Sequence, residues 1–217
     1  MRRFRSVSPL AMALIAWTTT PPAKCAPAPD PLAKAKASVG ILYVDNHDGT
    51  ASHGSCTAVG ARQVMFCWHL KDGTAPKDMT IVIQGKTLHP EIMGVEDTFG
   101  IKILFLPKES PLAVWAQPDP AVTYLKGAAV TAIGYSGDTS QFESIVGEMT
   151  ALMEYRPRGT NKAIPIIRIS QVLKPGMHGG GAFDEKGNLV GLILGLAEGE
   201  KTGVVLPLTE DDTKTPK

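Results

Sequence analysis

Long hydrophobic runs are missing from this 217-residue sequence. The clearest apolar stretch, PLAMALIAW at residues 9–17, is far shorter than the roughly 20 residues that a helix needs to cross a bilayer. Runs of Lys and Arg interleaved with aromatic residues are also missing, which argues against a nucleic-acid partner. No long stretch keeps a helical apolar period. We therefore expect the mature protein to bind neither nucleic acid nor membrane.

The N-terminus has the composition of an export signal. Basic MRRFR precedes the apolar stretch, and polar TTT follows it, so residues 1–26 are predicted to be a signal peptide of a secreted or periplasmic protein. The cleavage site stays open between Ala23 and Ala26. A lipid-modified Cys25 and a basic tail on a cytosolic protein are the alternatives. The first 26 residues hold four of the 22 basic residues and none of the 21 acidic ones, so the remaining chain carries a charge of about −3.

Short apolar segments rich in Val, Ile and Leu fill the rest of the chain, and turn residues separate them. This pattern predicts an all-β protein with two antiparallel barrels of the six-stranded type, side by side. Residues 27–37 are rich in Pro and Ala and are predicted to be a linker. We place the N-terminal barrel at about 38–115 and the C-terminal barrel at about 120–210. A short tail, 211–217, follows.

Two of the three cysteines, Cys56 and Cys67, fall in this predicted β-domain and flank a turn. If Val59 faces Val64 across the hairpin, the two thiols lie directly opposite each other, within reach of a disulfide. A pair of buried free thiols is the equal alternative. An oxidising compartment would favour the bridge.

Three motifs occur in a telling order. MFCWHL ends a strand with His69, VEDTFGIKIL carries Asp97 at the start of another strand, and PGMHGGGAF carries His178 among glycines. This order resembles the trypsin-like serine proteases, most closely their HtrA-type branch. HGSCTAVG, GAAVTAIGY and GNLVGLILG resemble further strands of that family. The resemblance covers about 38–208 and leaves no segment for a PDZ domain.

The resemblance implies a role for each matching residue. His69 would be the general base and Asp97 its orienting acid, with Glu96 as the alternative acid. The backbone N–H groups of Gly176 and of residue 178 would form the oxyanion hole. An apolar specificity pocket without a carboxylate would be lined by Val172, Leu194 and Leu196. The implied nucleophile is a serine at position 178, where this chain has histidine.

The histidine at position 178 changes the expected activity. Loss of the nucleophile of a triad lowers turnover on the order of 10⁶-fold. An imidazole can attack a carbonyl, but its acyl product is too high in energy to form readily from an amide. We therefore expect a pseudoprotease that binds a peptide or protein ligand in its cleft, with no cofactor.

Two alternatives stay open. The chain could be an active serine-type endopeptidase that uses another nucleophile. It could instead be a metal-binding protein in which His69 and His178 hold Zn²⁺ or Cu²⁺. The pseudoprotease interpretation, in contrast, predicts that no metal is bound. Ser136 in IGYSGD also sits between glycines, but a turn at the end of a strand explains this motif without any chemistry.

Overall fold

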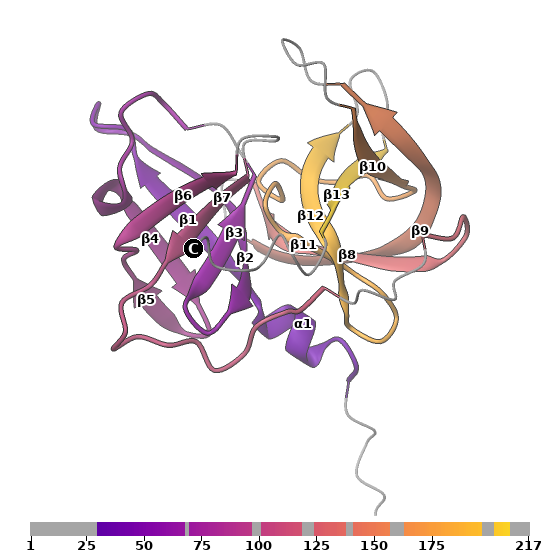
Figure 1. Cartoon of the computed structure of the whole chain (residues 1–217), viewed down its shortest axis with the longest axis horizontal. Coiled ribbons are helices and arrows are strands. Elements are labelled where there is room, and N and C mark those ends of the chain that lie inside the picture. Colours follow the sequence, from indigo (N-terminus) through magenta and orange to yellow (C-terminus); the bar gives the residue numbers. More distant parts are fainter. Residues whose placement is uncertain are drawn as a thin grey trace, which may run out of the picture.

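Two β-structures lie side by side in the computed structural model, and one short helix, α1, lies below them in the view of Figure 1. The structure describes residues 30–67, 70–96, 101–118, 124–137, 141–156, 163–196 and 202–208. The predicted signal peptide, 1–26, lies outside these ranges. None of the helices within them is long and apolar enough to span a membrane.

The first β-structure is a curled seven-stranded antiparallel sheet with the order β5-β4-β1-β2-β3-β7-β6. Its strands are β1 (Val39–Asp45), β2 (Ala51–Gly60), β3 (Gln63–Phe66), β4 (Met79–Ile83), β5 (Lys86–Leu88), β6 (Ile92–Glu96) and β7 (Ile101–Phe105). A 3₁₀ turn, η1 (Pro76–Asp78), precedes β4. Alternation of buried and half-buried residues along β4 turns Met79, Ile81 and Ile83 into the core of the sheet.

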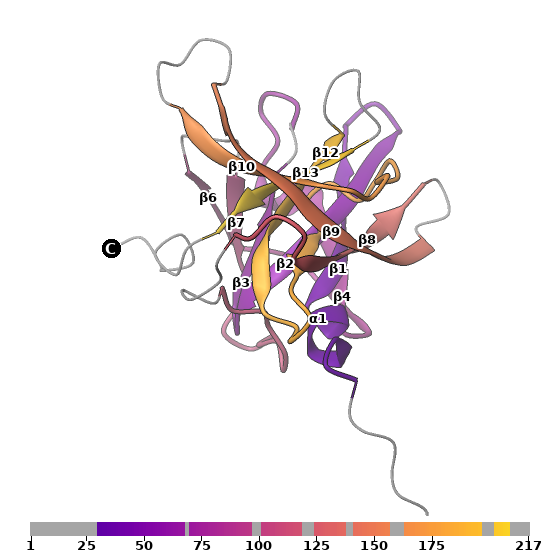
Figure 2. The same cartoon turned by 90° about the vertical axis from the view of Figure 1, so that its right-hand side faces the viewer.

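The second β-structure is a closed six-stranded barrel with the order β10-β13-β12-β11-β8-β9. Its strands are β8 (Ala129–Ser136), β9 (Gln141–Tyr155), β10 (Ile164–Ile169), β11 (Gly181–Phe183), β12 (Leu189–Leu196) and β13 (Gly203–Pro207). The long strand β9 crosses the front of the barrel in Figure 2 and pairs with β8 along its first half and β10 along its second. The predicted all-β fold with paired barrels is confirmed, although the first sheet curls without closing.

An apolar cluster joins the two β-structures. Met65 and Ile103 from the first sheet pack in one buried cluster with Phe183 and Leu192 from the barrel. Removing such side chains from water is the main favourable term in folding, at about 25 cal/mol per Å² of apolar surface. The cluster therefore holds β2 and β3 against β8 and β12, which is where the candidate site lies.

The predicted pairing of Val59 with Val64 is wrong. Thr57 faces Met65 and Ala58 faces Val64, and the register shifts at Val59, between Ala58 and Gly60. A bulge adds one residue to one strand and changes what lies opposite. The two cysteines consequently occupy different apolar clusters: Cys56 lies inside the first sheet, and Cys67 packs against the cluster between the two structures.

Both thiols, at Cys56 and Cys67, are free in the structure. Of the two alternatives left open by the sequence, the structure therefore has the free thiols and not the disulfide.

The predicted linker at 27–37 needs a correction for its last five residues. Ala33–Ala37 forms the helix α1, and Ala35 is only 1% exposed because it packs into the cluster between the two β-structures. Alanine is the best helix former, and Leu32 at the N-cap packs against the same cluster as Ala35. Composition alone suggested a linker because the docking surface is tertiary.

Candidate functional site

The segment 170–180, between β10 and β11, contains the glycine cluster and His178. Strand β2 holds this segment through three hydrogen bonds. The backbone N–H of Ser55 donates to the carbonyl of His178 at 3.0 Å, and the Thr57 hydroxyl donates to the carbonyl of Gly179 at 3.0 Å. The Ser55 hydroxyl donates to the carbonyl of Gly176 at 2.9 Å. The first sheet thus fixes a loop that belongs to the second barrel.

The glycines are there because the loop passes very close to two strands. A Cβ on Gly179 would lie 2.2 Å from the carbonyl oxygen of Ser55, and one on Gly180 would lie 2.3 Å from that of Ile133. Gly176 and Gly179 also have φ values of +91° and +83°, which side chains other than glycine rarely adopt. The glycine cluster therefore allows the backbone to take a tight path between the two strands.

Ser55 is a residue of this site that the sequence analysis did not single out. It is fully buried, and its hydroxyl also accepts a hydrogen bond from the N–H of Tyr135 in β8 at 2.8 Å. One side chain thus ties β2 to the loop and to the second barrel. No signal in the sequence pointed to it, because Ser55 is one of several polar residues in β2, along with Ser52, His53 and Thr57.

The two predicted oxyanion donors lie on this loop. Among the described residues, no hydrogen bond from the backbone N–H of Gly176 or of His178 is found. The neighbouring N–H groups of Met177, Gly179 and Gly180 do donate to backbone carbonyls. Gly176 is half-buried and His178 is exposed, so these two N–H groups are open to a ligand, and two such donors in one loop are what an oxyanion hole requires.

The imidazole of His178 lies against strand β12. A Cβ placed on Gly195 would be 2.3 Å from its Nε2, so the ring covers the Cα of Gly195. The residue as a whole is exposed, and the ring is therefore covered on one side only. Burial on that side lowers the pKa of His178 below its usual value, which favours the neutral imidazole.

His69 and Asp97 lie outside the described residues, as does the side chain of Glu96. Their predicted roles consequently stay predictions. The strands that lead to them are described, however. Phe66 at the end of β3 pairs with Lys102 of β7, and Lys102 pairs in turn with Val95 of β6. β3 and β6 both pair antiparallel with β7, so they run parallel to each other, two strand spacings or about 10 Å apart. The C-terminal ends of β3 and β6 therefore lie at the same edge of the sheet.

Cys67 connects this edge with the loop of His178. Its thiol donates a hydrogen bond to the carbonyl of Ile193 in β12 at 3.0 Å, and the N–H of Gly179 donates to the same carbonyl at 2.8 Å. Cys67 precedes His69 by two positions in the sequence. In the structure it lies directly against the segment that follows His178. Burial raises the pKa of the Cys67 thiol to about 12, which keeps it protonated.

The residues predicted to line a specificity pocket are only partly brought together. Val172 leaves 57% of its surface exposed, whereas Leu194 is half-buried against the cluster between the two β-structures. The side chain of Leu196 lies outside the described residues. The pocket therefore stays a prediction.

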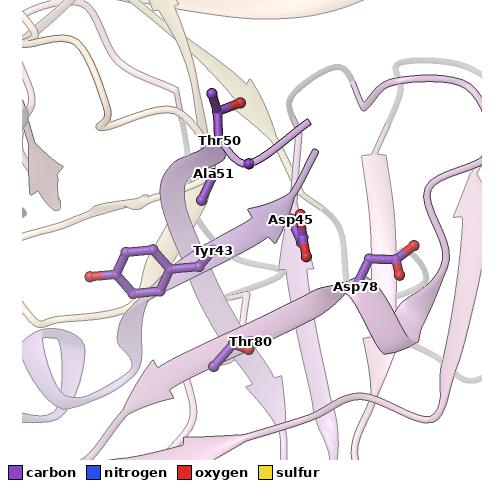
Figure 3. A pocket seen from close by; sticks show the side chains of 7 residues that line it. Tyr43, Asp45, Thr50, Ala51, Asp78 and Thr80 are labelled. Atoms are coloured by element: carbon purple, nitrogen blue, oxygen red, sulfur yellow. The ribbon is translucent and has the colours of Figure 1, made fainter. Parts of the chain in front are cut away.

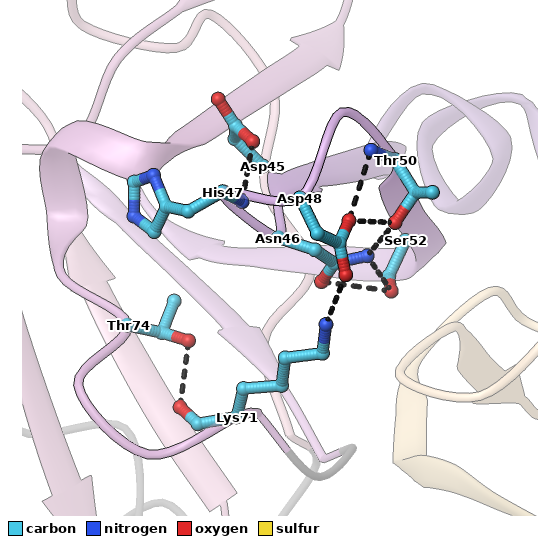
Figure 4. Close-up of polar contacts among 8 residues, drawn as sticks. All are labelled: Asp45, Asn46, His47, Asp48, Thr50, Ser52, Lys71 and Thr74. Atoms are coloured by element: carbon cyan, nitrogen blue, oxygen red, sulfur yellow. Dashed lines mark hydrogen bonds and ion pairs between the residues drawn. The ribbon is translucent and has the colours of Figure 1, made fainter.

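A shallow pocket of about 390 Å³ lies elsewhere, on the outer face of the first sheet (Figure 3). Tyr43, Asp45 and Asp78 are among its lining residues, and none of the predicted site residues is. Hydrogen bonds fix the adjoining β1–β2 turn, in which Asp48 accepts from Thr50 and Lys71 (Figure 4). These two partners lower the pKa of Asp48, with Lys71 contributing most. The polar groups of this turn thus bind one another.

Of the two further sequence alternatives, the structure bears on Ser136 only, because the metal pair needs His69, which lies outside the described residues, and that alternative stays open. Within the described part of the chain, no group of three or more His, Cys, Asp or Glu side chains could hold a metal ion. The Ser136 hydroxyl donates to Glu143 at 2.9 Å, and Ser136 pairs with Gln141 in the β8–β9 hairpin. The geometry of Ser136 agrees with the turn interpretation of its motif.

The fold and the loop together define a protein with the chymotrypsin-like double-barrel architecture. The family description "trypsin-like peptidase domain" matches residues 54–192, and the chain belongs to this family. No curated protein matched the sequence.

Solved structures of proteases share this fold. The Rv3671c protease from M. tuberculosis in its active form is 18% identical, with a TM-score of 0.69; the match covers 94% of this chain and 89% of that one. The HtrA-type protease AlgW, solved with a decapeptide, is 17% identical with a TM-score of 0.66; the match covers 82% of this chain and 63% of that one. At these identities the similarity concerns the fold.

Proposed function

We propose that this protein is a catalytically impaired trypsin-like peptidase that binds a peptide or protein segment in its cleft without cutting it. The observation that carries the proposal is the side chain at position 178. The backbone there has the setting of a nucleophile loop, with two N–H groups without a partner among the described residues and a carbonyl fixed by Ser55. The side chain is an imidazole that lies on Gly195.

The chemistry of that side chain supports impaired catalysis. In a working triad, a hydroxyl attacks the carbonyl and passes its proton to the histidine base. His178 has no hydroxyl, and a neutral imidazole that attacked an amide would form a reactive acyl-imidazole. We infer that any remaining proteolysis is slower, on the order of 10⁶-fold, than in an enzyme with a complete triad.

Peptide binding is the function that the remaining groups support. The pair of N–H groups can hold a carbonyl oxygen in its ground state without any covalent step. The similar protease AlgW has been solved with a decapeptide and with a tripeptide. We extend to this chain only the expectation of an extended peptide in the cleft, with His69 and Asp97 still in the roles that the family resemblance gives them. The protein would act after export, as a secreted or periplasmic domain spanning about 38–210.

A fluorescent fluorophosphonate probe, which reacts with activated serines, tests the proposal. Wild-type protein should not be labelled, His178→Ser should be labelled, and the double variant His178→Ser, His69→Ala should again be unlabelled. Casein hydrolysis should follow the same order.

Two results would contradict the proposal. Casein cleavage by wild-type protein that disappears in His69→Ala would establish the alternative, an active endopeptidase. Failure of folded His178→Ser to react would contradict the roles that the proposal keeps for His69 and Asp97, because more than the nucleophile would then be missing.

A further inference from the structure

The contact between His178 and Gly195 is unusually close. An ideal Cβ on Gly195 would lie 2.3 Å from Nε2 of the ring, 2.9 Å from Cδ2 and 3.1 Å from Cε1. Three ring atoms within this range mean that the ring lies across the Cα of residue 195. Gly195 has in addition a φ of +126°, a conformation that other residues rarely adopt. Only glycine at position 195 permits this position of the ring.

The local path of β12 presents Gly195 to the ring. Ile193 pairs with Val205 and Gly195 pairs with Val204, so the register shifts at Leu194. A bulge of this kind changes the direction in which the following residue faces. Gly195 lies between Leu194 and Leu196, the two strand residues predicted to line the specificity pocket. The ring therefore covers the strand at the place where the side chain of a bound peptide would be expected.

The surroundings of the ring favour an uncharged imidazole. Burial lowers the pKa of His178, which favours the neutral imidazole, the form that loses least on packing against the Cα of Gly195. Cys67, which bonds to Ile193 on the same strand, stays protonated because burial raises its pKa to about 12, so it brings no charge to the contact.

We propose that His178 and Gly195 form a fitted plug that narrows the cleft and selects its ligand. With the ring seated, the space over Gly195 is occupied, and a bound segment can place only glycine or alanine opposite that position. The ligand class is thus an extended peptide with a very small residue at one site. This selectivity rests on the proposed function, because it presumes that the cleft binds peptide.

A double-mutant cycle tests whether the ring lies on Gly195 in solution. Gly195→Ala adds the same backbone strain in any background, but it collides with the ring only when His178 is present. We expect Gly195→Ala to push the ring aside in wild-type protein and therefore to lower the urea midpoint more there than in His178→Ala. In wild-type protein the pKa of His178, followed by NMR, should lie below its usual value and rise in Gly195→Ala. Equal midpoint shifts in both backgrounds would overturn the plug.

Peptide binding tests the selectivity separately. Pools of fluorescein-labelled octapeptides, each with one fixed position set to Gly, Ala, Leu or Phe, are titrated with the protein and followed by anisotropy. Wild-type protein should bind the Gly or Ala pools at least tenfold more tightly than the Leu and Phe pools at one position. In His178→Ala that ratio should fall below about threefold.

The outcomes separate the two proposals. An unchanged ratio in His178→Ala, with binding retained, refutes the plug and leaves the peptide-binding function standing. Absence of binding by both proteins refutes the peptide-binding function and with it the selectivity. In that case, the double-mutant cycle measured by urea unfolding still decides whether the ring lies on Gly195.

Discussion

The position of the loop against β2 can be tested with two matched glycines. Gly179 and Gly127 have nearly the same left-handed φ, +83° and +85°. A Cβ on Gly179 would lie 2.2 Å from the carbonyl oxygen of Ser55, whereas a Cβ on Gly127 would have nothing within 4 Å. Substitution by alanine therefore adds the same backbone strain at both positions and a steric collision at only one of them.

The expected losses of stability follow from these two terms. A left-handed alanine costs roughly 1–2 kcal/mol, which should be the whole effect of Gly127→Ala. Gly179→Ala should lose a further 1–3 kcal/mol or more, because the clashing oxygen belongs to the backbone of a buried strand and the loop has to move. Urea unfolding followed by tryptophan fluorescence measures both losses.

A second readout connects the loop with the proposed chemistry. In the His178→Ser background, Gly179→Ala should abolish labelling by the fluorophosphonate probe, and Gly127→Ala should leave it intact. If the two alanine variants lose equal stability, within about 0.5 kcal/mol, the loop does not lie against Ser55 as described and the reasoning about the site is refuted.

Two more predictions concern buried groups near the loop. Ser55→Ala leaves the carbonyl of Gly176 and the N–H of Tyr135 without their partner, so it should cost about 2–4 kcal/mol in urea unfolding. The same change at exposed Ser144 should cost less than about 0.5 kcal/mol. Equal losses would contradict the role of Ser55 in holding the loop to β2 and β8. Burial raises the pKa of Cys56 and of Cys67 to about 12, so both thiols should resist iodoacetamide at pH 8 in folded protein. After unfolding, both should react without a reductant, which peptide mass mapping measures. A need for reductant would contradict the free thiols.

The sequence predicted the features that local chemistry determines. Short apolar segments separated by turn residues predicted the strands of both β-structures, and the glycines around His178 are residues that permit a backbone pressed against its neighbours. The positive φ of Gly176 and Gly179 bears this out. In both cases the signal lies in the residues themselves, since pleating and left-handed backbone each restrict which residues can occur.

The features that the sequence did not reveal depend on distant partners. The bulge at Val59 moved the hairpin register by one residue, and nothing in SCTAVGARQVMFC distinguishes a bulged pairing from a regular one. The helix at Ala33–Ala37 forms where a docking surface exists for Ala35. Ser55 became recognisable as a clamp only once β8 and the loop lay beside it.

The family resemblance implies a serine nucleophile at position 178, and the loop around His178 could keep its path with either residue there. Its conformation depends on positive φ at Gly176 and Gly179 and on contacts made by backbone carbonyls to Ser55 and Thr57. None of these contacts uses the side chain of residue 178, so a histidine there alters the chemistry and leaves the loop path unchanged. Space for the larger ring is a separate requirement, and Gly195 meets it. A chain with histidine at 178 and any side chain at 195 would have to move its ring or its strand, which makes residue 195 the position to examine in related proteins that lack the serine.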